Sequence, residues 1–443
     1  MNRYSESTLT VKFLLCNAIY HFAGAKGFMR GKADSDLVRR QNRFVVLEAL
    51  RFHGPSARVD LARLTGLSPA TITTITTQLI QDGAIAECED ATSMPDITRR
   101  GRPTVLLGLK ADAAYLIAIK ISIGMLEFAL ADFAGQVLAR SQIPVETYNM
   151  EPEIFSNRLI AETRNFIVSS DADIERLAQI SVAAQGVTDN IAGAIAWSPA
   201  FKAGDVQIIK PLYKAFGVSC RLANDANMIA EGLIARKKVE PQGTTACVFM
   251  GYGIGMGLVI DGAVYHGSSG SSAELGHMNQ VPGGALCRCG RHGCLEAYAS
   301  DYGILRSAEN LPDDTPPPLR AVDSSVMAAL EKAARQGDKN ALAAFQKAGR
   351  AIGFGLARMI ALLNPDRIVL AGAGTRALDL IEPALRAAID EGVVGALRQN
   401  LKIETLPIEK DMIISGTIDA ALRHLDSEIY SVGRIEAKKE LVA

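Results

Sequence analysis

The most specific pattern in the chain lies in residues 274–296, which read ELGHMNQVPGGALCRCGRHGCLE. Three cysteines, Cys287, Cys289 and Cys294, fall within an eight-residue stretch, and His277 precedes the first of them by ten residues. This spacing is too tight for a disulfide framework and is typical of metal ligands. One imidazole and three thiolates form a four-coordinate set suited to a structural zinc ion, because soft ligands favour zinc over magnesium.

The loop around these cysteines also has the glycines that a tight metal loop needs. Gly290 and Gly293 let the chain fold back so that the three thiolates converge on one ion. His292 is a weaker candidate ligand because it is confined between Arg291 and Gly293. The alternative interpretation is a loop of three reduced cysteines beside a core histidine. We predict one structural zinc per chain, held by His277 and the three cysteines.

Length and composition place the chain among soluble globular proteins of several domains. Of its 443 residues, 48% are hydrophobic and 21% charged, which excludes wholesale disorder, a collagen-like chain and a coiled coil. Its 47 Lys and Arg nearly cancel its 48 Asp and Glu, so the net charge of −1 indicates no polyanionic partner for the whole chain. No apolar run of about 18 residues predicts a membrane span. Because the remaining cysteines are scattered, we expect a reducing, cytoplasmic setting.

The N-terminal part of the chain begins without a clear pattern. We expect residues 1–38 to form a poorly ordered extension and a first helix to begin at its end. This helix has an apolar face because Phe44, Leu47 and Leu50 recur at intervals of three. Gly54-Pro55 is predicted to end it.

Two shorter helices follow, separated by a turn that contains glycine. The first spans Arg58–Thr65 and is expected to bury Leu61 and Leu64. The second spans Pro69–Gln81, with Ser68 as its N-cap and proline at the first helical position, where no backbone N–H is needed. The residues expected on its inner face are Ile72, Ile75 and Leu79. Helix, turn and helix in this order form the helix-turn-helix pattern.

A basic hairpin is predicted after the third helix. A short strand at Ala84–Ala86 and another at Thr104–Leu109 flank a polar tip. The tip contains Arg99, Arg100 and Arg102. Two strands around a basic tip form a wing, so the whole N-terminal segment predicts a winged helix-turn-helix.

The near-neutral charge of the chain conceals this basic module. Residues 39–65 hold six arginines and two acids, and arginines on the first helix and the wing can pair with DNA phosphates. The third helix presents small hydroxyl side chains to a major groove, and Gln78 can bond adenine. We predict a DNA-binding domain over residues 39–109. Its predicted DNA contacts are Arg58, Ser68, Ala70, Thr71, Thr73, Thr74, Gln78, Arg99, Arg100 and Arg102. The alternative is a three-helix protein-interaction module with a solvated basic loop.

The rest of the chain alternates strands and helices, an order that indicates an α/β fold with sheets covered by helices. The predicted strands are 116–119, 126–130, 177–183, 245–250 and 368–371, and the predicted helices are 154–168 and 348–363. Because about 330 residues exceed one ordinary core, we expect residues 110–443 to form two lobes with a cleft. Lobe one is expected at 110–235 plus 410–430, and lobe two at 236–409.

Four motifs of this region resemble those of the ROK family (repressors, open reading frames and sugar kinases). They are the Glu-x-Gly-His segment with its cysteine loop at 274–296, the segment Leu222–Asn227, the glycine loop Gly251–Gly257 and the segment Pro365–Gly372. The resemblance extends over about residues 110–430 and implies a two-lobed fold like that of actin and hexokinase. The winged helix, with its Gly101-Arg102-Pro103, resembles the family's transcription-factor branch.

The resemblance also implies a sugar site. The family's sugar-contacting positions correspond here to Gly186, Asn224, Asp225, Glu274, His277 and Glu296. Carboxylates accept hydrogen bonds from sugar hydroxyls at fixed angles, and zinc would support the site by orienting His277 and the Glu296 loop. In the family's kinases the residue matching Asp225 is the general base. Without the family, Asn224 and Asp225 are equally well explained as a helix N-cap, and the glutamates as solvated or capping residues.

One segment departs from the kinase pattern. The family's kinases carry Asp-x-Gly-x-Thr on the first hairpin, where it holds the ATP phosphates. Here Lys120 stands where the acid should be, Gly124 is the one glycine left in the turn, its neighbours are bulky, and no threonine follows. The glycine loop at 251–257 remains, although a tight strand turn would explain it equally well. We therefore expect no ATP binding or phosphoryl transfer, with Asp225 serving as a sugar ligand.

The sequence thus predicts a DNA-binding transcriptional regulator that is not an enzyme and that represses genes of sugar uptake and catabolism. Its expected partners are operator DNA and a sugar or sugar derivative, with no membrane contact. Because two-fold symmetry suits a palindromic operator, a homodimer or homotetramer is expected. One alternative is an active ATP-dependent hexose kinase that also binds DNA. Another is a regulator that responds to a protein partner and whose sugar pocket is vestigial.

Overall fold

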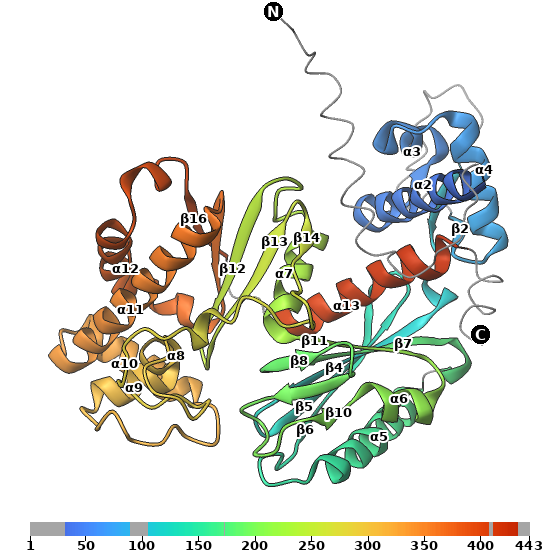
Figure 1. The fold of residues 1–443 in the computed structure, drawn as a ribbon. Coiled ribbons are helices and arrows are strands. Elements are labelled where there is room, and N and C mark those ends of the chain that lie inside the picture. Colours follow the sequence, from blue (N-terminus) through green and yellow to red (C-terminus); the bar gives the residue numbers. More distant parts are fainter. Residues whose placement is uncertain (1–31, 89–104, 172, 407–410, 433–443) are drawn as a thin grey trace, which may run out of the picture.

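The computed structural model describes residues 32–88, 105–171, 173–406 and 411–432. The chain has three parts, an N-terminal helical module and two lobes that each contain a five-stranded sheet (Figure 1). The α/β fold predicted from the sequence is confirmed. Within the described ranges, no helix has the length and apolar character needed to cross a bilayer.

The N-terminal module is a winged helix-turn-helix. Its elements are α2 (Lys32–His53), α3 (Arg58–Thr65), α4 (Pro69–Gln81), β1 (Ser56–Ala57), β2 (Ile85–Cys88) and β3 (Leu106–Leu109). The strands form an antiparallel sheet in the order β1-β3-β2. Helices α3 and α4 have the predicted bounds, and Ser68 caps α4 by accepting a hydrogen bond from the Thr71 N–H.

Two expectations for this module are wrong. The first helix begins at Lys32 rather than near residue 38, so residues 32–38 are helical. The sequence does not mark these turns because their apolar side chains are exposed and show no buried period. Leu64, expected in the core, is 41% exposed, because the short helix α3 turns Leu61 inward instead.

Lobe one is a twisted sheet covered on both faces. Its strand order is β11-β7-β4-β5-β6, with β4, β7 and β11 parallel and β5 and β6 added antiparallel. The elements are β4 (Tyr115–Ser122), β5 (Met125–Asp132), β6 (Val137–Pro144), α5 (Pro152–Ser169), β7 (Leu177–Ala184), α6 (Ile209–Phe216), β11 (Ser219–Asn224) and α7 (Asp225–Ala235). A smaller sheet contains β8 (Val187–Asp189), β9 (Ala194–Trp197) and β10 (Val206–Gln207). Alternate residues of β4 enter two separate cores, one on each face of the main sheet.

Lobe two has the strand order β14-β13-β12-β15-β16. Its elements are β12 (Thr244–Met250), β13 (Ile254–Ile260), β14 (Ala263–Val264), α8 (Glu296–Ala299), α9 (Asp301–Ala308), α10 (Ser324–Arg335), α11 (Lys339–Leu363), β15 (Arg367–Ala371), α12 (Leu378–Gly392) and β16 (Lys402–Thr405). The predicted helix at 348–363 is the second part of α11, which begins earlier, at Lys339. Small residues let α11 lie directly on α12, since a Cβ at Gly353 would lie 2.3 Å from the Leu385 carbonyl oxygen.

The last long helix, α13 (Met412–His424), returns to lobe one and packs on α7, β4 and β7. A Cβ at Gly416 would lie 1.8 Å from the Met228 carbonyl oxygen, so α13 and α7 touch backbone to backbone. Figure 1 shows α13 running from the middle of the molecule to the N-terminal module. A π-helical segment, η6 (Leu425–Tyr430), continues α13 there.

The N-terminal module is packed on lobe one and shares a core with it. One continuous cluster contains apolar side chains of α2 and α4, of β4 and β5, and of α13. Arg43 of α2 is buried and donates to the Tyr430 carbonyl at 2.9 and 2.7 Å. Arg51, two turns further along α2, forms a bidentate pair with Asp426 at 2.8 and 2.9 Å. The helices of the N-terminal module are therefore fixed to the C-terminal end of the larger domain.

Candidate functional site

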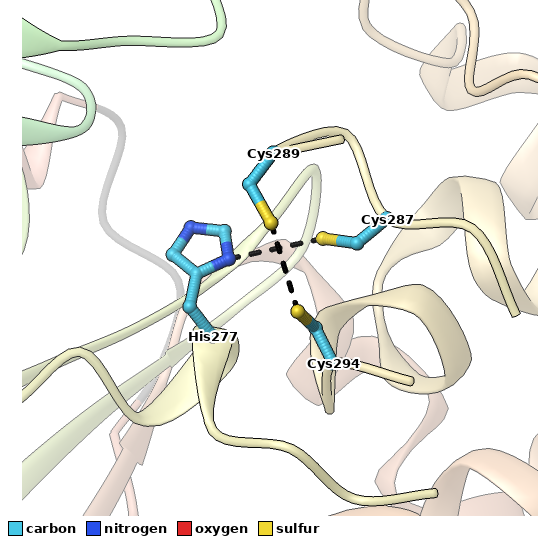
Figure 2. A group of neighbouring side chains, drawn as sticks. All are labelled: His277, Cys287, Cys289 and Cys294. Carbon is cyan, nitrogen blue, oxygen red and sulfur yellow. Dashed lines mark hydrogen bonds between the residues drawn. The ribbon is translucent and has the colours of Figure 1, made fainter. Parts of the chain in front are cut away.

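Four side chains meet at one point in lobe two (Figure 2). His277 closes the short turn η3 (Leu275–His277), and Cys287, Cys289 and Cys294 come from the loop that follows. Their ligand atoms all lie within 4.8 Å of one another. The Sγ atoms of Cys289 and Cys294 are 3.6 Å apart, and Sγ of Cys287 lies 3.7 Å from Nδ1 of His277. An ion ~2.3 Å from each sulfur would set tetrahedral ligands ~3.8 Å apart, so these distances fit a zinc site.

The chemistry of the donors also suits zinc. The pKa of the Cys289 thiol lies well below its ordinary value because Cys287 and Cys294 donate to its sulfur, and the thiolate is the form that binds metal. Figure 2 shows the second ring nitrogen of His277 turned away from the three sulfurs. One side chain can therefore serve the cluster through Nδ1 and another partner through Nε2.

The cysteine loop depends on its glycine. Gly293 has a φ of +85°, and a Cβ there would lie 1.8 Å from the Val281 carbonyl oxygen, so no other residue fits. His292 is not part of the cluster, since its Nε2 lies 3.1 Å from Asp314 Oδ1 on the exposed side of the loop.

A pocket lined by residues of both lobes opens beside this cluster. All six residues that the resemblance assigned to sugar contacts line it, and they come from both lobes. They are Gly186, Asn224, Asp225, Glu274, His277 and Glu296. His277 belongs to the pocket and to the cysteine cluster, so the two sites share a wall.

Asn224 forms the pocket floor at the junction of β11 and α7. Its Oδ1 caps α7 by accepting a hydrogen bond from the Ala226 N–H at 2.8 Å, and its Nδ2 donates to the Gly186 carbonyl at 2.7 Å. Gly186 has a φ of +106°, and a Cβ there would lie 2.3 Å from the Trp197 carbonyl oxygen. The Asn224 side chain therefore caps helix α7, as one interpretation of the sequence expected, and it also lines the pocket.

Two glutamates of lobe two present fixed carboxylates to the pocket. Glu296 is buried, and its two oxygens accept hydrogen bonds of 3.3 Å from the Tyr302 hydroxyl and the Ile254 N–H. Its Oε1 also lies 3.9 Å from Sγ of Cys287, which ties it to the cysteine loop. Burial raises the pKa of the Glu274 carboxyl.

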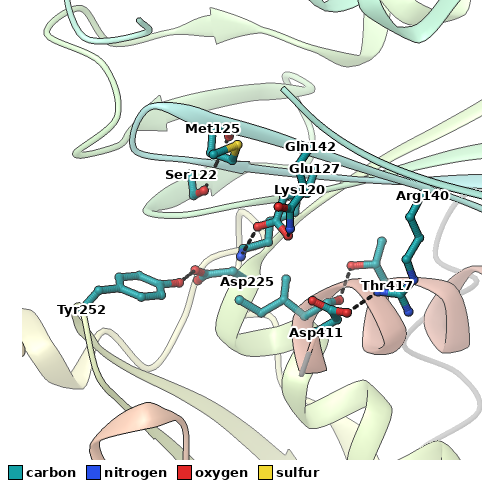
Figure 3. Close-up of polar contacts among 11 residues, drawn as sticks. Lys120, Ser122, Met125, Glu127, Arg140, Gln142, Asp225, Tyr252, Asp411 and Thr417 are labelled. Carbon is teal, nitrogen blue, oxygen red and sulfur yellow. Dashed lines mark hydrogen bonds and ion pairs between the residues drawn. The ribbon is translucent and has the colours of Figure 1, made fainter. Parts of the chain in front are cut away.

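Asp225 faces lobe two across the pocket (Figure 3). The Tyr252 hydroxyl donates to its Oδ2 at 2.8 Å. Burial raises the pKa of Asp225, while the hydrogen bond from Tyr252 and the ammonium group of Lys120 oppose that rise. Lys120 itself donates to Glu127 on β5 at 2.5 Å. The Lys120 side chain is thus held in an ion pair.

Motif comparison alone did not identify several pocket residues. They are Gln185, Trp197, Phe249 and Tyr252. Trp197 is the sole tryptophan of the chain, and its ring centre lies 5.2 Å from that of His277, edge to face. The rings of Phe249 and Tyr252 lie 5.1 Å apart. An aromatic residue between two glycines of a supposed phosphate loop was the signal that could have identified Tyr252.

The glycine loop at 251–257 has a clear packing role. A Cβ at Gly255 would lie 3.1 Å from Cβ of Ala226, and one at Gly257 would lie 2.7 Å from the Ala226 carbonyl oxygen. These glycines therefore let strand β13 lie directly on the first turn of α7. The first hairpin turns at Gly124, whose φ is +71°.

Several predicted DNA-contacting residues are exposed on α4. They are Ala70, Thr73 and Thr74, with the capping residue Ser68, while Thr71 is half-buried. The hydroxyls of Thr73 and Thr74 donate to the carbonyls of Pro69 and Ala70 at 2.8 and 3.0 Å. Because those donors are used within the helix, the methyl groups of the threonines remain for contact with bases.

Two other predicted DNA contacts are engaged within the module. Oε1 of Gln78 accepts a 3.3 Å hydrogen bond from Arg43, and Nε of Arg58 donates to the Thr76 hydroxyl at 3.1 Å. These contacts engage the Gln78 carbonyl oxygen and the Arg58 Nε, so donors of the Gln78 amide nitrogen and the Arg58 Nη atoms are the groups that could reach DNA. The predicted wing residues Arg99, Arg100 and Arg102 lie outside the residues that the structure describes.

Comparisons with known proteins agree with this architecture. The model of the ROK family matches residues 116–421. The N-acetylglucosamine repressor of Shigella flexneri is 27% identical over 368 residues, which cover 83% of this chain and 89% of that protein. The transcriptional repressor Mlc of Escherichia coli is 26% identical over 384 residues, 86% of this chain and 93% of that one. The xylose repressor of Bacillus spizizenii is 24% identical over 393 residues, which cover 88% of this chain and 97% of that protein.

Two solved structures are similar in fold. The crystal structure of a ROK family transcriptional regulator, a homolog of the Escherichia coli Mlc protein, has a TM-score of 0.72 and 27% identity, covering 91% of this chain and 99% of that one. A ROK family glucokinase from Streptomyces griseus, solved with glucose and AMPPNP, has a TM-score of 0.56 and 22% identity. The match covers 69% of this chain and 99% of the kinase chain. The kinase thus shares the fold of the two lobes.

Proposed function

Because the chain belongs to the ROK family, we propose that it is a sugar-responsive transcriptional repressor without enzymatic activity. In this proposal the winged helix binds operator DNA at genes of sugar uptake and catabolism, and a sugar or sugar derivative in the pocket between the lobes is the effector. One observation carries the proposal: helix α7 begins in the pocket, and Lys237, just past its other end, lies over the ring of Phe52 in the N-terminal module. The repressors among the chain's relatives support it.

The pocket suits a pyranose. Asp225, Glu274 and Glu296 supply carboxylate oxygens that accept hydrogen bonds from several ring hydroxyls at fixed angles. Trp197 adds an apolar wall, on which the C–H groups of a sugar ring can pack. The Nε2 atom of His277 points away from the sulfurs, so it can form a hydrogen bond with one further hydroxyl.

One contact argues against phosphoryl transfer. The ammonium group of Lys120, at the position of the kinase acid, is paired with Glu127 and cannot help to hold a magnesium ion. An ADP-release assay with a hexose panel tests this part of the proposal. We expect no turnover above the protein-free rate, and steady ADP release with any hexose would overturn the non-enzyme assignment.

We assign one structural zinc per chain to His277, Cys287, Cys289 and Cys294. When bound, the ion would supply rigidity rather than reactivity, because four protein ligands leave no open coordination position. It would hold η3 against the cysteine loop and so fix the ring of His277 and the carboxylate of Glu296 at the pocket wall.

Helix α7 offers a direct connection from the pocket to DNA. Its N-terminus carries Asn224 and Asp225, and just past its other end the ammonium group of Lys237 lies 3.7 Å from the ring centre of Phe52 in α2. An 11-residue helix spans about 16 Å and moves as a rigid rod. A shift of Asp225 on sugar binding would therefore reach the DNA-binding module.

Helix α13 offers a second connection. It crosses α7 at Gly416, where the two backbones touch, and its continuation η6 holds Arg51 and Arg43 of α2 through Asp426 and Tyr430. Arg43 reaches on to Gln78 and Asp82 around the end of α4. Closure of the lobes around a sugar would move α7 and α13 together. In a homodimer or homotetramer, such a movement would change the placement of two recognition helices on a palindromic operator.

A thermal-shift assay with a sugar panel tests the effector site. We expect at least one sugar to raise the unfolding temperature, since a ligand that binds the folded state stabilises it. Glu274→Ala should abolish that shift, whereas Glu309→Ala, an exposed position after α9, should leave it unchanged. If no sugar stabilises the protein, or if Glu274→Ala responds like the parent chain, the proposed effector site is wrong.

A further inference from the structure

The pocket is an array of hydrogen-bond acceptors. Besides the carboxylates of Asp225, Glu274 and Glu296, it contains the buried side chain of Gln185, whose Oε1 has no hydrogen-bond partner within the described chain. Among the described residues that line the pocket there is no lysine or arginine. An array of this kind matches a ligand that is rich in hydroxyl donors and carries no negative charge.

Two cations lie close to Asp225 and Tyr252 without lining the pocket: Lys120, and Arg288, whose Nε has no hydrogen-bond partner within the described chain. Lys120 is paired with Glu127 at 2.5 Å. Arg288 donates to the Tyr252 carbonyl at 3.2 Å and lies over the ring of Tyr302, 4.6 Å from its centre. Neither side chain lines the pocket, so neither stands ready to pair with an anionic group of a ligand.

Tyr252 occupies the side of Asp225 that faces the glycine loop. Figure 3 shows its side chain reaching from that loop to the carboxylate of Asp225, where its hydroxyl donates at 2.8 Å. The residue lies between Gly251 and Gly253, and its ring is held against Phe249. The Tyr252 ring therefore lies in the pocket wall next to the carboxylate of Asp225.

We infer that the effector is a neutral, unphosphorylated sugar and that Tyr252 is the residue that excludes its phosphate ester. This inference rests on the proposed function. A phosphate at the hydroxyl next to Asp225 would bring ~1.5 to 2 negative charges against that carboxylate and would collide with the Tyr252 ring. A free hydroxyl at the same place can instead donate to Asp225 beside the tyrosine hydroxyl, since a carboxylate oxygen accepts more than one hydrogen bond.

Trp197 provides the measurement, because it is the sole tryptophan and it lines the pocket. The emission of the full-length protein is titrated with glucose, mannose, galactose and N-acetylglucosamine, and separately with the 6-phosphate of each. We expect a saturable change with at least one neutral sugar and binding of its 6-phosphate weaker by about 100-fold. A 6-phosphate that binds as tightly as, or more tightly than, its neutral sugar overturns the inference and leaves the proposed function intact. No response to either set overturns the proposed function itself.

Two substitutions distinguish the contribution of the Tyr252 ring to specificity from that of its hydroxyl. Tyr252→Ser removes the ring and should narrow the preference for the neutral sugar by about tenfold or more, while Tyr252→Phe keeps the ring and should retain the preference. Tyr213→Ser, at a half-exposed tyrosine of α6 outside the pocket, is the matched control. Zinc content and the unfolding temperature report whether each variant is folded. An unchanged preference in a folded Tyr252→Ser protein removes Tyr252 from the specificity role.

Discussion

Arg51 of α2 and Asp426 of η6 form a bidentate ion pair, at 2.8 and 2.9 Å, that joins the DNA-binding module to the C-terminal end of the larger domain. The Asp426 side chain is 2% exposed, and Arg51 also donates to the Phe133 carbonyl at 2.7 Å while lying over the Phe133 ring. The pair is therefore enclosed between the module, lobe one and the end of α13. A movement of α13 would therefore displace the helices of the N-terminal module through this pair.

Replacing Arg51 by glutamine is expected to lower the free energy of unfolding by roughly 3 kcal/mol, because the buried carboxylate of Asp426 loses its partner. Burial raises the pKa of Asp426 even beside Arg51, so the folded state holds this proton more tightly than the unfolded state does. Protonation of Asp426 therefore raises the free energy of unfolding as the pH falls towards the pKa that this aspartate has in the unfolded chain. The loss in Arg51→Gln should therefore shrink between about pH 8 and about pH 5, as measured by urea unfolding.

Two further variants control for this prediction. Asp426→Asn combined with Arg51→Gln should recover most of the lost stability, because no buried charge remains. Arg386→Gln breaks the exposed pair with Glu382 and should cost less than about 1 kcal/mol. A loss that is the same at both pH values, or a double variant as unstable as Arg51→Gln alone, would contradict the role assigned to the pair.

Cys289→Ser should remove zinc and weaken the sugar pocket together. Serine is a poor zinc ligand, and without the ion the loop no longer fixes His277 and Glu296. Metal analysis should fall from about one zinc per chain to near zero, and the sugar-dependent thermal shift should disappear. Cys220→Ser, at a half-buried cysteine of β11 outside the cluster, should keep both. Unchanged metal content in Cys289→Ser would refute the ligand assignment.

Gly416→Ala should separate sugar binding from the DNA response. The added Cβ would lie 1.8 Å from the Met228 carbonyl, so α13 must move away from α7, at a cost of typically 1–3 kcal/mol of stability. Sugar binding measured by Trp197 emission should remain, while the sugar-dependent change in DNA affinity should fall. Gly395→Ala, where the added Cβ would meet only the Arg398 side chain at an ordinary contact distance of 3.8 Å, is the control. A variant of normal stability with a full response would show that the α7–α13 contact is not part of the connection.

Arg102→Ala should weaken operator binding. If this wing residue pairs with a phosphate, the slope of log K against log salt should become less negative by about 0.9. Arg320→Ala removes the same charge from an 86%-exposed site in lobe two and should leave DNA binding unchanged. Equal effects of the two substitutions would show that the effect comes from overall charge and not from the wing.

The elements with strong local signals could be predicted from the sequence. Helices α3 and α4 were predicted closely because Ser68, Pro69 and the glycine turn mark their ends by side chain and backbone chemistry alone. The start of α2 at Lys32 could not be predicted, because Leu37 and Val38 are exposed and residues 32–38 have no apolar period. Five of the six pocket residues named from the family resemblance lie in two short motifs, 222–227 and 274–296, whose patterns are local.

The contacts that depend on the tertiary fold could not be predicted. Arg51 and Asp426 are 375 positions apart, and no local pattern pairs them. Gln78 was expected on the DNA-facing side of α4, but its side chain bonds Arg43 across the module. Tyr252 was visible in the sequence as part of a glycine loop, yet its meaning depends on Asp225, which another lobe supplies. The role of such a residue can be assigned only when the structure shows which distant residue it contacts.

The central claim is that a sugar in the pocket controls DNA binding without chemistry. The most direct test uses an operator fragment that the full-length protein selects from a random DNA pool. Its anisotropy is measured with and without the sugar that changes Trp197 emission, and in the absence of ATP. We predict that saturating sugar raises the Kd for this DNA by about 5–150-fold in the parent chain and leaves it unchanged in Glu274→Ala. A Kd that stays the same while the pocket is occupied would contradict the account.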